Sequence, residues 1–136
     1  MTKGTLFDAS SLILALKLRK IQALRNCYIQ WLTVYEVMNA LWKEASLKHT
    51  LSPNEAEKIV EVLEKLLYFL HILDPLQREV DILKLASRLK ITAYDASYIV
   101  QARDNELELV TEDEELRSKA TEFVKSLSFK ELIKTS

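Results

Sequence analysis

Four acidic residues stand where a fold could gather them into one reactive site. They are Asp8, Glu36, Asp95 and Asp113. Three of them come soon after segments with strand-like composition (5–7, 28–31 and 107–110), and the fourth lies in the first turn of a helix opened by Thr92. Carboxylates brought together repel one another unless a cation lies among them, and their oxygens are ligands that suit Mg²⁺ or Mn²⁺. The spacing therefore indicates a divalent-metal site, provided that the fold brings these segments together.

The same acids also fit a purely structural role. The segments 33–36, 92–95 and 111–114 each place an acid three residues after a threonine, which is the pattern of a helix capping box. The segment 52–55 has the same pattern with a serine and follows no predicted strand, so it is an internal control for capping alone. Acids are also favoured in a first helical turn by the helix dipole. Taken singly, each acid is better explained by capping than by catalysis.

Asp8 and Asp113 fit the capping explanation less well than the other two. Asp113 stands one residue before Glu114, the acid that would close its box, and Asp8 has no box partner. We therefore expect that neither residue is needed for capping.

Short apolar segments alternate with helical patterns along the chain, and these elements must position the acids. The predicted strands are 5–7, 28–31, 69–73, 107–110 and 124–127. The predicted helices cover 12–16, 17–25, 33–45, 52–67, 76–86, 92–100, 112–123 and 129–133. This alternation predicts an α/β fold with a parallel sheet covered by helices on both faces. In such sheets, ligands bind outside the carboxyl ends of the strands, where these acids would lie.

Composition bounds the class of protein. The chain has 136 residues, 49% of them apolar, so we expect one globular domain over 1–136. Nineteen basic against twenty acidic residues give a net charge of −1, which excludes nucleic-acid binding by bulk positive charge alone. One cysteine excludes a disulfide scaffold, and no apolar run is long enough to cross a membrane. We expect a soluble, cytoplasmic protein with no membrane association.

The chain contains a single glycine. A glycine-rich phosphate loop is therefore impossible, which excludes Walker-type NTPases and dinucleotide-binding Rossmann enzymes. We also expect few turns with positive φ.

Four segments carry a resemblance to a known family. They are Phe7-Asp8-Ala9-Ser10, then 32–41 (LTVYEVMNAL), then Tyr94-Asp95-Ala96, and finally Leu109-Val110-Thr111-Glu112-Asp113. Their order and spacing resemble the PIN-domain nucleases, and within these the chain is similar to VapC-type toxins of toxin–antitoxin pairs. The resemblance covers residues 5–127.

The resemblance implies a PIN-like α/β/α sandwich around a short, mainly parallel sheet, with the activity of an endoribonuclease. It assigns the binding of Mg²⁺ or Mn²⁺ to Asp8, Glu36, Asp95 and Asp113. It places hydroxyl groups that orient carboxylates or water at Ser10 and Thr111. Asn39 lies three residues after Glu36, so both side chains should leave one helix face toward the same pocket. In-line hydrolysis would leave a 5′-phosphate and a 3′-hydroxyl.

The resemblance also implies partners, namely an RNA substrate, an antitoxin protein and a second copy of the chain. Without the four acids the net charge of −1 becomes +3, and Lys17, Arg19, Lys20 and Arg25 could meet phosphates or form a solvated helix face. For Trp31, Tyr35 and Trp42 we expect core packing, whereas the resemblance suggests a dimer contact or a groove for an antitoxin segment. The 9–27 stretch is shorter than is common in such toxins, so no RNA preference follows.

Three alternatives stay open at this point. The first is a PIN-type nuclease of RNA processing that has no antitoxin. The second is a non-catalytic, receiver-like signalling domain with an acidic Mg²⁺ pocket, although only Asp8 stands at the first strand and Lys125 is poorly placed for the usual late lysine. The third is a degenerate fold kept for binding, against which the four intact acids argue.

Overall fold

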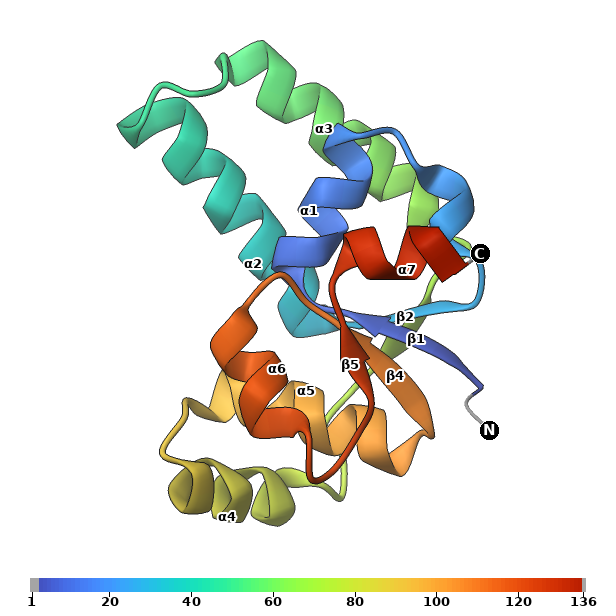
Figure 1. The fold of residues 1–136 in the computed structure, drawn as a ribbon. Helices are drawn as coiled ribbons and strands as arrows, with labels where there is room; N and C mark the ends of the chain where they lie inside the picture. Colours follow the sequence, from blue (N-terminus) through green and yellow to red (C-terminus); the bar gives the residue numbers. More distant parts are fainter. Residues whose placement is uncertain (1–2, 136) are drawn as a thin grey trace.

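A five-stranded parallel sheet lies at the centre of the computed structural model, which describes residues 3–135 (Figure 1). The strands are β1 (Gly4–Phe7), β2 (Cys27–Gln30), β3 (His71–Leu73), β4 (Leu107–Val110) and β5 (Ser126–Leu127). Their order is β3-β2-β1-β4-β5, and every neighbouring pair is parallel. The chain first builds outward from β1 to β3 and then returns to the other side of β1. The topological switch point therefore falls between β1 and β4.

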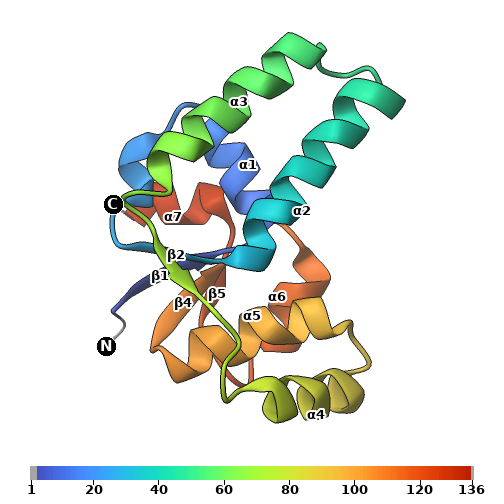
Figure 2. The same ribbon diagram turned by 180° about the vertical axis from the view of Figure 1, so that it is seen from behind.

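Helices cover both faces of this sheet (Figures 1 and 2). They are α1 (Ala9–Lys17), α2 (Trp31–Trp42), α3 (Pro53–Leu66), α4 (Glu79–Leu89), α5 (Ala93–Asp104), α6 (Glu114–Ala120) and α7 (Phe129–Thr135). A 3₁₀-helix η1 (Ile21–Leu24) follows α1, and a π-helix η2 (Lys43–Leu47) follows α2. In Figures 1 and 2, α1, α3 and α7 lie on one side of the sheet, α4, α5 and α6 lie on the other, and α2 and α3 extend away from it. This arrangement confirms the predicted α/β/α sandwich.

Alternating side chains along the strands feed two separate cores. Phe7 and Val110 are buried with the helices on the α1 side, whereas Leu6 and Leu109 are buried with those on the α5 side. Because both faces of β1 and β4 are covered, the apolar strands need no solvent-facing side. The carboxyl ends of these two central strands are thereby held rigidly at one edge.

Of the four predicted capping boxes, the one at Ser52 and Glu55 forms in full. At the start of α5, the Thr92 hydroxyl accepts the amide hydrogen of Asp95 as a cap, but among the described residues the Asp95 carboxylate returns no hydrogen bond to Thr92. Helix α2, however, begins at Trp31, because Gln30 at its N-cap position makes reciprocal hydrogen bonds with Thr33. The predicted strand 28–31 therefore ends one residue earlier, and Thr33 closes this box from within the first turn of α2 instead of opening the helix. Helix α6 is capped by Asp113 rather than by a threonine.

The predicted helix over 17–25 is also wrong. Helix α1 ends in a Schellman motif: the amide of Lys20 donates to the carbonyl of Ala15, and the amide of Arg19 donates to the carbonyl of Leu16. Arg19 itself adopts φ 57°, a conformation that glycine usually supplies. This turn ends the helix, and only the short η1 follows.

The expectation of few positive-φ turns is wrong for the same reason. Six non-glycine residues of the described range adopt positive φ; they are Arg19, Asn26, His49, Gln77, Lys90 and Glu106. Each carries a steric cost of about 1–2 kcal/mol relative to an ordinary conformation. Gly4 serves close packing instead, since a Cβ there would lie 2.4 Å from the carbonyl oxygen of Asn26. Within the described residues, no helix is both long enough and apolar enough to span a membrane.

Candidate active site

Asp8 stands at the end of β1 and is the N-cap of α1. Its side chain is 8% exposed, and Oδ1 accepts hydrogen bonds from the Ser11 amide (3.0 Å) and the Ser10 hydroxyl (2.7 Å). Oδ2 accepts a hydrogen bond from the hydroxyl of Thr111, which follows β4. The expectation that Asp8 is not needed for capping is therefore wrong. Because donors reach both oxygens from two chain segments, the carboxylate is fixed in orientation.

The loop between β4 and α6 is joined to the start of α1 by hydrogen bonds. The amide of Glu112 donates to the Ser10 hydroxyl (3.0 Å), and the amide of Asp113 donates to the Thr111 hydroxyl (3.1 Å). Arg117 donates to the carbonyl oxygen of Thr111. These bonds hold the two chain segments that leave the central strands as one unit.

Asp113 is exposed and caps α6 with one oxygen, since Oδ1 accepts the amides of Glu115 (3.0 Å) and Leu116 (3.1 Å). The expectation that capping does not require Asp113 is thus wrong as well. The box predicted for Thr111 does not form because Thr111 is fully buried and directs its hydroxyl to Asp8. The pattern of a threonine followed by acids predicts a helix cap at Thr111. In the structure, this threonine contacts Asp8 instead.

Glu36 lies in the second turn of α2 and caps no helix. The hydroxyl of Tyr98, from α5, donates to its Oε1 at 2.6 Å. Burial raises the pKa of the Glu36 carboxyl above its ordinary value, and the nearby charges of Asp8 and Asp95 add to this effect while the Tyr98 hydrogen bond opposes it. Glu36 is thus a partly buried carboxylate that experiences the negative charges of two other candidate ligands.

Asp95 lies in the first turn of α5, on the opposite side of the sheet from α2. Burial is the largest cause of the raised pKa of its carboxyl, and the charges of Asp113, Asp8 and Glu115 raise it further. Asp95, Asp113 and Glu115 line one cavity of about 390 Å³ between α5 and α6. Glu115 therefore lies beside these acids.

The structure thus brings the four predicted acids from four elements to one edge of the sheet. After burial, the charges of Asp113 and Asp8 raise the pKa of Asp95. The charges of Asp8 and Asp95 likewise add to the effect of burial on the pKa of Glu36, on α2. Across residues 3–135, however, no three Asp, Glu, His or Cys side chains stand close enough together to enclose a metal ion as they are placed. The cluster is an open acidic pocket rather than a closed cage.

The remaining predicted residues fall in different places. The hydroxyl groups of Ser10 and Thr111 contact Asp8, as described above. Asn39 lies on α2 three residues beyond Glu36, but its side chain is exposed. Glu112, the residue between Thr111 and Asp113, accepts the amide hydrogen of Phe129 at the start of α7 (2.8 Å).

Sequence reasoning missed Tyr98 and Ser11. Tyr98 follows Asp95 by three residues, a spacing that places both on neighbouring parts of one helix surface. Residues 96–102 form one continuously buried stretch, and a tyrosine in such a stretch is expected to pack in the core, so its hydroxyl was not considered. Ser11 stands three residues after Asp8, which is the position of the amide that an N-cap side chain accepts. That spacing was a usable signal.

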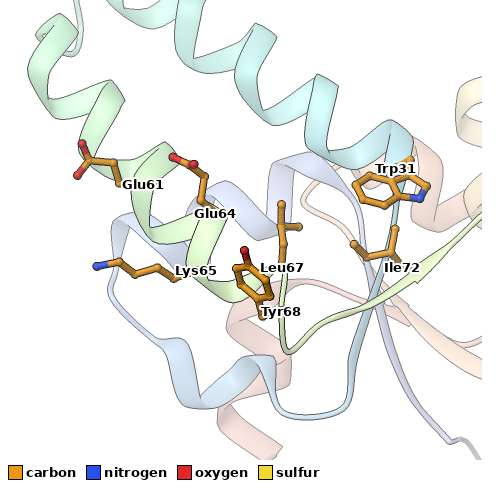
Figure 3. Close-up of a pocket in the computed structure, with 7 residues that line it drawn as sticks. All are labelled: Trp31, Glu61, Glu64, Lys65, Leu67, Tyr68 and Ile72. Carbon is orange, nitrogen blue, oxygen red and sulfur yellow. The ribbon is translucent and has the colours of Figure 1, made fainter.

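A second cavity, of about 670 Å³, lies between α3 and the start of α2 (Figure 3). It is lined by Trp31, Glu61, Glu64, Lys65, Leu67, Tyr68 and Ile72. The expected core packing of the three aromatic residues on α2 is wrong, because Trp31, Tyr35 and Trp42 are 54%, 68% and 51% exposed. Lys17, expected to be available for phosphates, is paired with Glu44 at 2.7 Å.

The fold and the acidic pocket define the class to which this chain belongs. It matches the PIN domain family over residues 6–122 and is a member of that family. The chain is 41% identical over 88 residues to a curated relative named Exonuclease VapC9, from Pyrobaculum aerophilum. The match covers 65% of this chain and only 62% of that relative. The crystal structure of PAE2754 from Pyrobaculum aerophilum superimposes with a TM-score of 0.78 at 28% identity, covering 98% of this chain and 94% of that one.

Membership of the PIN-domain family confirms the resemblance seen in the sequence. It excludes the receiver-like alternative, which rested on the same alternation of strands and helices. It leaves open whether the chain works with an antitoxin.

Proposed function

We propose that this chain is a nuclease that depends on Mg²⁺ or Mn²⁺ and hydrolyses the phosphodiester bonds of RNA. The observation that carries the proposal is the gathering of Asp8, Glu36, Asp95 and Asp113 at the carboxyl edge of the sheet, where burial and then the charges of neighbouring acids raise the pKa of Glu36 and Asp95. Helix caps that follow parallel strands also collect at this edge, but Glu36 and the side chain of Asp95 cap no helix. The relative named Exonuclease VapC9 supports nuclease chemistry.

The acidic residues fit a hard divalent cation in donor type and in charge. Oxygen ligands of this kind are those that Mg²⁺ and Mn²⁺ prefer, and a cation would offset the repulsion that raises the pKa of Asp95. As placed, the carboxylates of Asp8, Asp95 and Asp113 do not enclose an ion, so binding would bring them closer together. We propose these residues and Glu36 as the ligands.

The chain's own groups divide the remaining tasks between them. When bound, a divalent ion supplies Lewis acidity and neutralises charge on the phosphoryl oxygens. Ser10, Ser11 and Thr111 hold the Asp8 carboxylate in one orientation. Among the described residues, no donor contacts the side-chain oxygens of Asp95, whose raised pKa suits it to accept a proton from the attacking water. Hydrolysis would leave a 5′-phosphate and a 3′-hydroxyl.

The test of this proposal is cleavage of defined RNA by the purified protein. We expect cleavage of a linear single-stranded RNA with Mn²⁺ or Mg²⁺ and none with a chelator. The products should be degraded by an exonuclease that requires a 5′-phosphate. Cleavage that persists in chelator would contradict metal dependence, and equal cleavage of single-stranded DNA would contradict RNA specificity.

The mode of cleavage needs its own experiment, since the sequence resemblance implies an endonuclease and the relative is named an exonuclease. We propose internal cleavage, because the four sequence segments resemble those of the PIN-domain endoribonucleases. A circular RNA distinguishes the two modes, since it has no ends. Linearisation of the circle supports the endonuclease, whereas resistance of the circle with release of single nucleotides from the linear form supports the exonuclease.

We also propose that the chain is the toxin of a toxin–antitoxin pair. The surface between α2 and α3 supports this proposal, because the exposed Trp31, Met38 and Trp42 lie beside the acidic side chains of Glu61 and Glu64. An amphipathic antitoxin helix with basic flanks would match both features. Co-expression with the protein of an adjacent reading frame should give a copurifying complex with reduced nuclease activity. Trp42→Glu should break this complex, and an unaffected complex would exclude this surface.

A homodimer is the remaining partner that we propose. Exposed apolar side chains on α2, including Tyr35, are more than isolated surface residues usually supply. Light scattering at high concentration should give twice the mass of one chain. A monomer under those conditions would exclude the dimer.

A further inference from the structure

We infer that Tyr98 is a positioning residue that fixes the candidate metal ligand Glu36 through a directed relay of hydrogen bonds. The relay begins at the backbone amide of Gln30, passes through the hydroxyl of Thr33 and ends on Oε1 of Glu36. This inference rests on the proposed metal-dependent function. It adds to that function a group that neither caps a helix nor ligates the ion.

The relay crosses the molecule from α2 to α5. The Tyr98 hydroxyl lies 2.6 Å from Oε1 of Glu36 and 2.7 Å from Oγ1 of Thr33. The amide of Gln30 donates to the same Oγ1 at 3.0 Å. Tyr98 is 1% exposed and Thr33 is fully buried, so water does not compete for these bonds. All three distances are those of well-formed hydrogen bonds.

Counting protons gives the relay one direction. The phenol of Tyr98 has a single hydrogen to donate. An ionised Glu36 can only accept, so that hydrogen is donated to Oε1. The Tyr98 oxygen then has no hydrogen left for Thr33, and Thr33 must donate to it. The Thr33 oxygen in turn accepts the amide hydrogen of Gln30, so every group in the relay is satisfied.

The relay restrains a side chain that its backbone leaves free. Glu36 has several rotatable bonds, and fixing them costs conformational entropy unless a partner holds the carboxylate. Tyr98 occupies Oε1, and within residues 3–135 no hydrogen bond occupies Oε2. The free oxygen is thereby left for a cation. Carboxylates that bind metals are commonly held by such outer partners, whose loss weakens metal binding.

The hydroxyl of Tyr98 can be separated from its ring by substitution. The ring fills the core on the α5 side, which phenylalanine can do equally well, whereas the hydroxyl meets only Thr33 and Glu36. Tyr98→Phe therefore removes the relay with little change in packing. Tyr28→Phe is the matched control, because Tyr28 stacks on His71 at 4.5 Å and its hydroxyl contacts no carboxylate among the described residues.

The experiment is a calorimetric titration of the full chain with Mn²⁺ at one fixed pH. We expect Tyr98→Phe to bind Mn²⁺ about 10- to 100-fold more weakly than the wild type, and Tyr28→Phe to match the wild type. The melting temperature without metal should stay close to the wild-type value. In RNA cleavage, the loss should appear as a higher KM for Mn²⁺, with kcat recovered at saturating Mn²⁺. A purely structural role would not give this split.

A second pair of variants tests the other end of the relay and serves if Tyr98→Phe does not fold. Thr33→Ser keeps a hydroxyl and should bind Mn²⁺ as the wild type does, whereas Thr33→Val should bind more weakly. Wild-type affinity in folded Tyr98→Phe, or in Thr33→Val, would overturn the relay alone. Absence of Mn²⁺ binding by the wild type would overturn the proposed function and the relay with it.

Discussion

The two halves of the acidic pocket are held in place by different means. Asp8 and Asp113 stand beyond the central strands and cap the next helices, so backbone amides hold their carboxylates. Glu36 and Asp95 project from within helices and cap nothing; Tyr98 holds the first, and no donor holds the side chain of the second among the described residues. Capping and chemistry are therefore not competing explanations, because one carboxylate can cap with one oxygen and face the pocket with the other.

The halves also differ in electrostatics. In the helix-borne half, burial and neighbouring negative charges raise the pKa of both Glu36 and Asp95. The ionised forms of these two carboxylates are disfavoured when no cation is present, and a bound cation would stabilise them. The capped half supplies a fixed platform, and the helix-borne half supplies the charge that responds to an ion.

The largest expected effect comes from Asp8→Asn in the capped half. Asparagine is as good an N-cap as aspartate, so α1 should keep its cap and the fold its stability. Loss of the negative charge should reduce RNA cleavage by at least about 100-fold, since metal assistance supplies several kcal/mol. Cleavage is measured with excess Mn²⁺, and stability by urea unfolding. Full activity in this variant would remove Asp8 from the site.

At Asp113, two substitutions separate the cap from the chemistry. Asp113→Asn should lose activity and keep stability, whereas Asp113→Ala should lose activity and also about 1 kcal/mol of unfolding free energy. Ser52→Ala is the matched control: it removes the cap of α3 at a similar cost, but activity should not change. Equal stability of the two Asp113 variants would mean that its cap contributes nothing.

In the helix-borne half, Glu36→Gln should make the protein more stable at pH 7 while reducing activity. The pKa of Glu36 is raised in the folded chain, so folding favours the protonated form, and wild-type stability falls as pH rises through the range above 4.5. Glutamine removes that loss. The melting temperature should rise by a few degrees at pH 7, and the difference should vanish below pH 4.5.

Glu55→Gln is the opposite case and provides the control for that measurement. Hydrogen bonds at Ser52 lower the pKa of Glu55, so its contribution to stability is present above 4.5 and is lost as pH falls. This substitution should give no gain in melting temperature at pH 7. If both variants respond alike, the raised pKa of Glu36 is not the cause.

The smallest effect is expected for Asn39→Ala. Asn39 is exposed, unlike the buried Tyr98, so its loss should reduce cleavage less than about tenfold, the lower limit for partners that hold a ligand directly. The measurement is the rate of RNA cleavage at saturating Mn²⁺. A larger loss would assign Asn39 a direct part in the pocket and would extend the helix-borne half.

The strands and the candidate acids could be predicted because each is marked by a pattern of neighbouring residues in the sequence. The apolar run at 107–110 matches β4, and Ser52 with Glu55 forms the expected box. Errors arose where the same short pattern had two physical solutions. Thr33 and Thr111 were predicted to open helices as N-caps. Instead, Thr33 accepts the Gln30 amide from within the first turn of α2 and contacts Tyr98, and Thr111 donates to Asp8.

Contacts between segments distant in sequence could not be predicted from spacing alone. Tyr98 meets Glu36 across 62 residues of chain, and Thr111 meets Asp8 across 103. Each contact depends on the order of strands in the sheet, which places β4 beside β1 and α5 across from α2. The end of α1 was missed for a local reason, because Arg19 takes a left-handed conformation that its residue type does not announce.

The link from Glu112 to Phe129 has a practical consequence for work with this protein. The carboxylate of Glu112 fastens the first residue of α7, and the ring of that residue packs edge-on against Phe7, the neighbour of Asp8. A truncation that removed residues 129–135 would remove this ring, uncover Phe7 and take away the hydrogen-bond partner of Glu112, the residue after Thr111. Variants that lack α7 would therefore be unsuitable for kinetic measurements. A purification tag at this end should be removed before such measurements, because it could disturb the contacts of α7.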